Sequence, residues 1–268
     1  MNAVIADFVQ EYRSKTWIYA QNAAATARIC DKVLQAESVP GVVTHRVKNP
    51  SSLERKLCGR ERCFGRRYPS KKDIQDEISD LAGVRIVVCF PHDRERVQNA
   101  LGERFDIELT KHYGEVDTNS IVRPGYCATH CWVYLRENES QARDDRQRRR
   151  IEIQIVSMLR HAWAQFEHDA VYKAQSQMNP EDRQVLHSLS RAINCGESFL
   201  NSISESRAVC DIPSDVVFEM VYEVGCWVAD VAKQENQLQG TSIPLEEFLR
   251  ILKMARPIHL SCSIKSRL

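Results

Sequence analysis

The segment 150-RIEIQIVSMLRHAWAQFEHDAVYK-173 changes its periodicity partway along. Its first residues alternate three isoleucines with Glu152 and Gln154, which is the pattern of a β-strand with one apolar face. The residues that follow have helical spacing, so we predict a strand that leads directly into a long helix. If the isoleucine face of this strand lies against the core, its acid must meet a solvent-filled cleft, a cation or a metal ion on the other face.

Strands and helices alternate on both sides of this segment. The first 37 residues have helical spacing from position 3 onward, as one helix or two in sequence, and Pro40-Gly41 ends this pattern. The other predicted elements are a strand at 42–49, a helix from Pro50 to Lys56 or beyond, a basic glycine-rich loop at 58–72, a short helix at 71–79, a strand at 80–90, a helix at 93–105 capped by Asp93, a strand at 106–113, a loop at 114–125, a strand at 126–135, a charged connection at 137–150 and helices from Pro180 to Met254.

This order of elements predicts an α/β (α+β) fold, in which helices flank a mixed sheet of about five strands. We expect three parts: an N-terminal helical segment at 1–38, the α/β domain at 39–208 and a helical extension at 209–268. An apolar stripe in that extension could pair two subunits into a homo-oligomer, or it could pack onto the core of the same chain. The stripe consists of Val217, Met220, Val221, Val224 and Val228.

The composition is that of an ordinary soluble globular protein, with 43% apolar residues, 27% charged residues and a net charge of +1. This balance gives no overall basic field for nucleic acid or a membrane surface, so a local cluster would have to hold any anionic ligand. The arginine-rich run 143–150 is interrupted by Asp144 and Asp145, which favours a solvated loop over a nucleic-acid patch. The sequence has no apolar run of membrane-spanning length and no signal peptide, and we predict a cytoplasmic protein without membrane contact.

Ten cysteines are scattered along the chain without a CxxC pair. Neither a zinc site nor a disulfide framework is expected from this spacing, so we interpret the cysteines as buried hydrophobes or free thiols.

Asp80 and Glu152 are acids at strand positions. Asp80 stands at the head of an apolar strand, where it could also simply end the preceding helix, whereas Glu152 lies inside a strand. Two carboxylates from neighbouring strands form an oxygen-rich site of the kind that Mg²⁺ accepts, with phosphates completing its coordination. We therefore predict a magnesium site formed by this pair.

A second pattern, from Arg46 to Lys56, runs from the end of a strand into the start of a helix. Lysines and a hydroxyl that converge near a helix N-terminus suit a polyphosphate, although the same spacing also fits a solvated basic helix face. A third pattern places Tyr126 and His130 on one face of a strand with Ala128 between them, which leaves room for a planar base to stack. A half-exposed tyrosine in a sheet is the alternative interpretation.

Four motifs occur together in an order and at a spacing that resemble one protein family. They are RxKxxxSxxxK (Arg46, Lys48, Ser52, Lys56), DxAGxRI (Asp80 to Ile86), GYxxxH (Gly125, Tyr126, His130) and EIQI followed by AWAxxEHDxxYK (Glu152 to Lys173). Over residues 40–205 the chain resembles the synthetase domain of the RelA/SpoT family, which makes guanosine tetra- and pentaphosphate alarmones. It is most similar to the small members that lack a hydrolase domain. The resemblance implies a nucleotidyltransferase-like mixed sheet.

For the donor nucleotide, the resemblance implies that Arg46 and Arg85 sandwich the adenine of ATP. It also implies that Lys48, Ser52 and Lys56 hold the triphosphate. The expected reaction is the transfer of the β,γ-pyrophosphate of ATP to the 3′-hydroxyl of GDP or GTP, with release of AMP. Such a transfer depends on positioning, charge neutralisation and a base more than on covalent catalysis.

For the acceptor, the resemblance implies that Tyr126 stacks on the guanine and that His130 contacts the phosphates or the ribose. Asp80 and Glu152 would ligate Mg²⁺, and Glu152 would also be the general base. The remaining candidates for acceptor binding are Lys111, Arg123 and Gln154.

The sequence departs from the family pattern on the acceptor side only. The departures are Val122 and Pro124 where the family often has Lys and Asn, Lys111-His112-Tyr113 where Lys-Asp-Tyr is usual, and Val156-Ser157 where Arg-Thr is common. Three alternatives therefore stay open: an adenine nucleotide or GMP as acceptor, the 3′ end of tRNA as acceptor, or an inactive domain that binds nucleotides or alarmones as a sensor. The presence of both Asp80 and Glu152 argues against the sensor, because an inactive domain would have no need to keep the pair.

Overall fold

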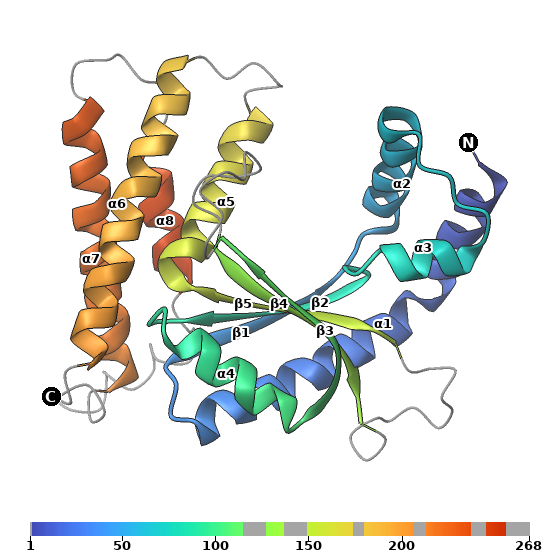
Figure 1. Cartoon of the computed structure of the whole chain (residues 1–268), viewed down its shortest axis with the longest axis horizontal. Helices are drawn as coiled ribbons and strands as arrows, with labels where there is room; N and C mark the ends of the chain where they lie inside the picture. The colour runs from blue at the N-terminus through green and yellow to red at the C-terminus, as the bar shows by residue number, and fades with distance from the viewer. Residues whose placement is uncertain are drawn as a thin grey trace, which may run out of the picture.

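The computed structural model of the chain describes residues 2–114, 127–136, 149–173, 180–205, 213–236 and 245–255. The elements in chain order are α1 (Ala3–Ala36), β1 (Gly41–Val47), α2 (Pro50–Phe64), α3 (Lys71–Glu77), β2 (Ala82–Val88), α4 (Asp93–Gly102), β3 (Phe105–Tyr113), β4 (Ala128–Leu135), β5 (Ile151–Ser157), α5 (Met158–Lys173), α6 (Pro180–Glu205), α7 (Ser214–Asn236) and α8 (Leu245–Met254). Figure 1 shows that α2 and α3 lie at one end of a central sheet and the C-terminal helices α5 to α8 at the other, while α1 runs beneath the sheet.

The sheet has five strands in the order β1-β2-β5-β4-β3. Strands β2 and β5 are parallel and the other neighbours are antiparallel, which confirms the predicted mixed sheet. The central strand β5 pairs Glu152 with Gly83 on one side and with Trp132 on the other. The acid that the sequence singled out therefore lies in the middle of the sheet.

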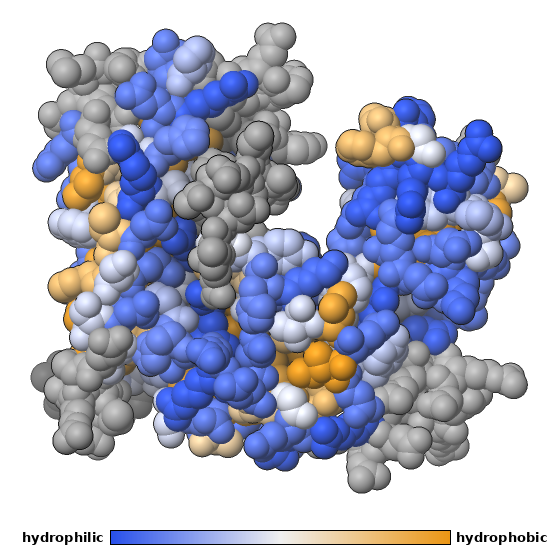
Figure 2. Space-filling view, viewed as in Figure 1, coloured by the Kyte–Doolittle hydropathy of each residue, from blue (hydrophilic) through white to orange (hydrophobic). Residues whose placement is uncertain are grey.

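One face of the sheet is covered by α1 and α4. The isoleucine side chains of β5 are fully buried in a core that also contains apolar residues along the length of α1. Because side chains alternate along a strand, Glu152 and Gln154 point to the opposite face. Figure 2 shows that the surface between α2–α3 and α5–α8, above that opposite face, is hollowed and mainly hydrophilic.

The C-terminal helices form a second core with α5. The four valines of the α7 stripe are buried in this core against α6 and α8 of the same chain, and Met220 packs against it partly buried, so the valines are not available to pair two subunits. The alternative interpretation of the stripe, packing within one chain, is confirmed. Among the helices that the structure describes, none combines the length and the hydrophobicity that a membrane crossing requires.

Two predicted local structures are wrong. The loop expected at 58–72 is helical up to Phe64, where Gly65 in the left-handed conformation ends α2. Its arginines led to the loop prediction, but Arg60 and Arg66 both pair with Glu77 of α3, so their charges are compensated within the fold. The short helix at 71–79 is confirmed as α3, with a capping box between Ser70 and Asp73.

Asp93 does not cap α4. The N-cap residue is His92, which makes no side-chain capping bond, and Asp93 is the first residue of the helix. Its carboxyl is buried and lies 3.4 Å from His92 Nε2 and 3.9 Å from Arg96 Nη1. Burial raises the pKa of this carboxyl above its ordinary value, although the charges of His92 and Arg96 lower it.

Close packing of α6 against α5 and α7 depends on Gly196. A Cβ atom at this position would lie 2.9 Å from Cγ2 of Val228, 3.1 Å from Cδ1 of Leu159 and 3.3 Å from Cγ1 of Val224. We expect Gly196→Ala to lower the free energy of unfolding by about 1–3 kcal/mol, because the branched Val228 side chain has little freedom to move aside.

Gly59→Ala in α2 is the matched control, since nothing lies within 4 Å of a Cβ there. It should leave stability unchanged or raise it by up to about 1 kcal/mol, the helix propensity difference between the two residues. Urea unfolding of both variants measures the two values. Equal stabilities would show that the α6 contact is not tightly packed.

Candidate active site

A polar pocket lies on the sheet face opposite α1. It opens between the ends of β1, β2 and β5, so residues far apart in the sequence meet there. The residues that line it are Thr44, His45, Arg46, Asp80, Gly83, Val84, Arg85, Glu152 and Gln154. The pocket therefore contains both acids singled out from the sequence and both arginines expected at the adenine.

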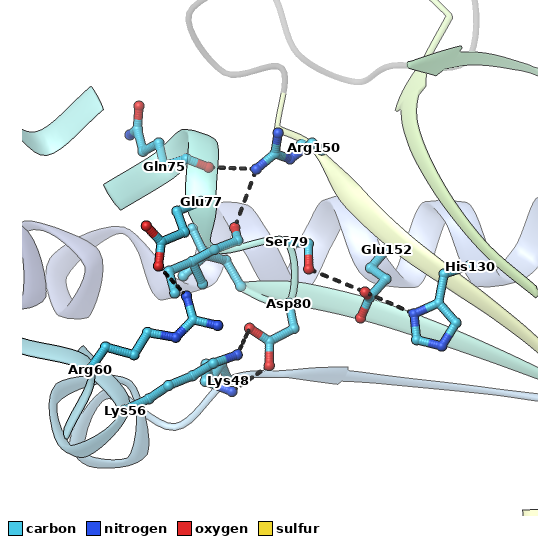
Figure 3. Close-up of polar contacts among 12 residues, drawn as sticks. Lys48, Lys56, Arg60, Gln75, Glu77, Ser79, Asp80, His130, Arg150 and Glu152 are labelled. Atoms are coloured by element: carbon cyan, nitrogen blue, oxygen red, sulfur yellow. Dashed lines mark hydrogen bonds and ion pairs between the residues drawn. The ribbon is translucent and has the colours of Figure 1, made fainter. Parts of the chain in front are cut away.

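Asp80 is held by two lysines (Figure 3). Lys48 Nζ lies 2.5 Å from Oδ2, and Lys56 Nζ lies 3.0 Å from Oδ1, so each oxygen has its own cation. Burial alone would raise the pKa of the Asp80 carboxyl, but the bond from Lys48 and the charge of Lys56 outweigh it and leave the pKa below the ordinary value. Asp80 is thus ionised at neutral pH.

Glu152 is more deeply buried, with 6% of the residue exposed, and is held by three donors. Two of them meet at Oε1, where Ser79 Oγ donates at 3.2 Å and His130 Nδ1 lies at 3.1 Å (Figure 3). The third, Gln154 Nε2, donates to Oε2 at 2.8 Å. An ionised carboxylate only accepts hydrogen bonds, so His130 carries its proton on Nδ1.

These donors keep Glu152 charged. Burial raises the pKa of its carboxyl, whereas the hydrogen bond and charge of His130 and the bond from Gln154 lower it, and the net result is a pKa below the ordinary value. A carboxylate offers about four acceptor positions, and the three donors occupy two at Oε1 and one at Oε2. Oε2 therefore retains room for one more donor.

The two carboxylates are close enough to repel each other, since the charge of Asp80 acts to raise the pKa of Glu152. A cation placed between them would relieve this repulsion. Two ionised carboxylates supplemented by phosphate oxygens and water suit Mg²⁺. The described residues contain no group of three or more His, Cys, Asp or Glu side chains placed to hold a metal. The chemistry of the two carboxylates is compatible with the magnesium site expected from the sequence, which stays a prediction.

Arg85 is fixed between the sheet and α5. Its Nε and Nη2 donate to Gln154 Oε1 at 3.2 and 2.9 Å, and its Nη1 lies 3.3 Å from His161 Nδ1. Burial, reinforced by the Arg85 charge, lowers the pKa of His161 to about 4. His161 is therefore neutral at pH 7 and can accept the hydrogen bond from Arg85. Gln154 links Arg85 to Glu152 because its amide contacts both.

The start of α2 has a regular N-terminal cap. Asn49 Oδ1 accepts from the backbone N–H of Ser51 and Ser52 at 2.9 and 3.3 Å, and Pro50 follows the cap. Ser52 Oγ accepts from Arg55 at 3.2 Å, and the lysine one turn later in α2 points to Asp80. Arg55 was not singled out from the sequence, although its charge adds to this end of the helix.

Tyr12 of α1 anchors this part of the site from behind. Its buried hydroxyl lies 2.8 Å from Lys48 O and 2.9 Å from Leu81 O, and the backbone N–H of Lys48 donates to Leu81 O at 3.0 Å. The backbone segments that carry Lys48 and Asp80 are thereby joined. No periodicity or motif marks this contact, because Tyr12 follows the ordinary apolar stripe of a helix.

On the acceptor side, the described residues include His130, Lys111 and Gln154. His130 contacts Glu152 and lies against Tyr113, with ring centroids 4.7 Å apart. Lys111 Nζ lies 4.7 Å from the ring centroid of Trp132. Tyr126 and Arg123 lie outside the described residues, so the stacking tyrosine stays a prediction.

The positions where Arg-Thr was expected from the family pattern are buried. Val156 lies under α5 in the second core, and Ser157 Oγ donates to Glu197 Oε1 of α6 at 2.7 Å. Ser157 Oγ also accepts from Arg160 N at 3.3 Å, near the start of α5. These two residues connect the sheet to the C-terminal helices and do not line the pocket.

Comparison with known proteins shows what this chain is similar to. Residues 45–177 match the model described as a region found in RelA / SpoT proteins. The chain is 30% identical over 129 residues to the GTP pyrophosphokinase YwaC of Bacillus subtilis (strain 168). That alignment covers 48% of this chain and 56% of YwaC, so it spans little more than half of the relative.

Solved structures show the same fold. A GTP pyrophosphokinase family protein from Streptococcus pneumoniae superposes with a TM-score of 0.62 at 21% identity, over 76% of this chain and 98% of that one. The small alarmone synthetase 1 of Bacillus subtilis, bound to its product pppGpp, superposes with a TM-score of 0.58 at 18% identity, over 75% of this chain and all of that one. The predicted α/β architecture and the resemblance are both confirmed.

The contact between His161 and Arg85 predicts a pH dependence of stability. The folded-state pKa of about 4 lies below the ordinary value of 6.5, so the unfolded chain takes up a proton first as the pH falls. The free energy of unfolding should therefore decrease between about pH 6.5 and pH 4, with a His161 share on the order of 3 kcal/mol. His161→Gln, which keeps an acceptor for Arg85, should lose less stability over this range.

Urea unfolding at several pH values measures this difference. His168→Gln is the matched control, because that histidine lies on the same helix with its ring exposed, and it should follow the wild-type profile. An identical pH profile for His161→Gln and the wild type would contradict the prediction.

Proposed function

We propose that this chain, whose residues 45–177 form a RelA/SpoT region, transfers the β,γ-pyrophosphoryl group of ATP to the 3′-hydroxyl of GDP or GTP. The observation that carries the proposal is the buried, ionised Glu152, which faces Asp80 in a pocket that also holds Arg46 and Arg85. The name GTP pyrophosphokinase of a relative at 30% identity supports it, as does the pppGpp bound to a protein of the same fold.

Glu152 is the general base of this reaction. The acceptor 3′-hydroxyl donates to Oε2, loses its proton to that oxygen and attacks the β-phosphorus of ATP. The bond between the β-phosphorus and the α,β-bridging oxygen breaks, and its electrons remain on AMP. His130 and Ser79, which both contact Oε1, fix the carboxylate so that Oε2 faces the acceptor. Proton transfer to a positioned base typically contributes 10²–10⁴-fold in rate.

Lys48 and Lys56 neutralise the polyphosphate. In the described structure both lysines bind Asp80, and each has further donor capacity because an ammonium carries three N–H groups. When the triphosphate of ATP arrives, the lysines turn part of this capacity to phosphate oxygens, with the hydroxyl of Ser52 beside them on α2. Asp80 and Glu152 would hold Mg²⁺, which would supply neutralisation of charge on the transferred group.

Arg46 and Arg85 hold the adenine. Both line the pocket from adjacent strands, and a planar guanidinium stacks well on an aromatic base. Gln154 and His161 fix the guanidinium of Arg85, so that little conformational freedom is lost when ATP binds. On the acceptor side, the resemblance implies that Tyr126 stacks on the guanine, and Lys111 and Arg123 are the further candidates for binding the acceptor.

The test of this function is a transfer assay with a panel of acceptors. Purified protein, Mg²⁺ and ATP labelled in the γ-phosphate are incubated with GDP, GTP, GMP, AMP, ADP or bulk tRNA. We expect label on GDP or GTP with one AMP released for each transfer. Label on an adenine nucleotide or on tRNA would show that the acceptor is not a guanine nucleotide. If ATP binds but no acceptor takes up label, the chain is a nucleotide-binding sensor and not an enzyme.

The base assignment predicts the behaviour of Glu152→Gln. This variant keeps the shape of the side chain and loses the proton acceptor, so we expect transfer to fall by on the order of 10²–10⁴-fold while ATP affinity changes by less than about twofold. Transfer is measured by AMP release and ATP affinity by calorimetry. Glu181→Gln, at the exposed start of α6, is the control and should retain the wild-type rate. Near wild-type transfer by Glu152→Gln would rule out Glu152 as the base.

A further inference from the structure

Arg150 stands just before β5, two residues ahead of Glu152, and its side chain reaches the end of α3. Its Nη2 donates to the backbone carbonyl of Gln75 at 2.5 Å (Figure 3) and lies 2.9 and 3.4 Å from the backbone carbonyl oxygens of Asp76 and Ile78. Only 12% of the Arg150 side chain is exposed. A single guanidinium therefore binds three backbone oxygens of another element.

These oxygens need a partner from elsewhere. The last carbonyl groups of a helix accept no hydrogen bond from within the helix. A cation near them also interacts favourably with the helix dipole. The last turn of α3 contains no basic residue, and Ile78 already leaves the helix in an extended conformation. Arg150, just before β5, supplies the cation that the last turn of α3 lacks.

Trp132 of β4 supports the guanidinium. The Arg150 Cζ atom lies 4.9 Å from the centroid of the Trp132 ring, within the range of a cation–π contact. Lys111 of β3 contacts the same ring at 4.7 Å. These contacts thus run from β3 through β4 to the residue before β5 and end at α3.

The segment that Arg150 holds is the one that carries the catalytic neighbours. Ile78 precedes Ser79, which donates to Glu152 Oε1, and Asp80 follows. The start of β5 and the segment 78–80 are therefore joined twice, once through the Arg150 side chain to a backbone oxygen and once through the Ser79 side chain to Glu152. Two attachments fix a separation that one attachment would leave free to vary.

We propose that Arg150, supported by Trp132, is a positioning residue that sets the separation between Asp80 and Glu152. Arg150 touches neither carboxylate in the described structure, and it acts through the backbone at Ile78. Its effect on catalysis rests on the proposed function, whereas its effect on the segment 78–80 does not. A displacement of about 1 Å at such a site can cost on the order of 10²-fold in rate.

The first test compares Arg150→Lys with the wild type in the transfer assay. A lysine keeps the charge but lacks the planar guanidinium whose Nη2 reaches the carbonyls of α3 while its Cζ lies over the Trp132 ring. We expect kcat to fall by about 10- to 100-fold while the KM for ATP changes by less than about twofold, because the contact does not reach β1. Arg136→Lys is the matched control, since Arg136 is an exposed arginine at the end of β4 that binds Gly102 O and Asp106, and it should keep the wild-type kcat.

The second test measures hydrogen–deuterium exchange and needs no activity. In Arg150→Lys the amides of residues 77–81 should exchange at least fivefold faster, with unchanged exchange in β1 and α6. Trp132→Phe, which keeps an aromatic face, should stay near the wild type in both assays, and Trp132→Leu should resemble Arg150→Lys. A variant that merely loses stability would instead exchange faster throughout.

The outcomes distinguish the positioning role of Arg150 from the proposed transfer function. Faster exchange at 77–81 together with a lower kcat supports the positioning role. Unchanged exchange at 77–81, or faster exchange with an unchanged kcat, overturns it. If the wild type transfers to none of the acceptors, the proposed function fails, and the exchange data alone decide whether Arg150 and Trp132 hold the segment.

Discussion

The burial of a charged carboxylate in the central strand is the constraint on which the rest of the site depends. Glu152 lies in the middle of a five-stranded sheet with most of its surface removed from water, and an ion in such a place is costly unless it is paired and hydrogen-bonded. His130, Ser79 and Gln154 meet this need from β4, from the segment before β2 and from β5 itself. The strand order is what brings these three donors to one carboxylate.

The second carboxylate, Asp80, places another negative charge near Glu152, and the two lysines that bind Asp80 compensate this charge only in part. Asp80 is neutralised by Lys48 and Lys56, yet its charge still acts on Glu152. In the described structure both oxygens of Asp80 are therefore bound by lysines, with which the predicted metal ion and phosphates would compete. A site built this way suits chemistry in which positioned charge, more than covalent catalysis, lowers the barrier.

Local patterns in the sequence predicted the helices and strands. The site contacts that these patterns did not predict are between residues far apart in the sequence. Alternation along 151–155 and the apolar run before residue 90 identified two neighbouring strands, so that Asp80 and Glu152 were expected together. The position of β5 between β2 and β4, however, does not follow from periodicity, and with it the contact between His130 and Glu152 was missed. Ser79, His161 and Arg150 were missed for the same reason, because their partners lie more than 60 residues away.

The incorrect prediction of a loop at 58–72 has a related cause. A cluster of arginines with two glycines is typical of a solvated loop when it is read locally. In the fold, Glu77 neutralises two of these arginines, and Tyr68 donates to the same carboxylate. Composition can indicate an excess of charge, but it cannot show a compensating acid on the next helix.

Helix α1 bears on which residues a fragment of this protein must contain to form the site. It ends before the residues that match the RelA/SpoT region, yet it covers one face of the sheet and binds the backbone beside two site residues through Tyr12. A fragment cut at the edge of the sequence match would expose the apolar underside of the sheet and release the carbonyls of Lys48 and Leu81. The part of the chain that is recognisable by similarity is thus smaller than the part that is needed to build the site.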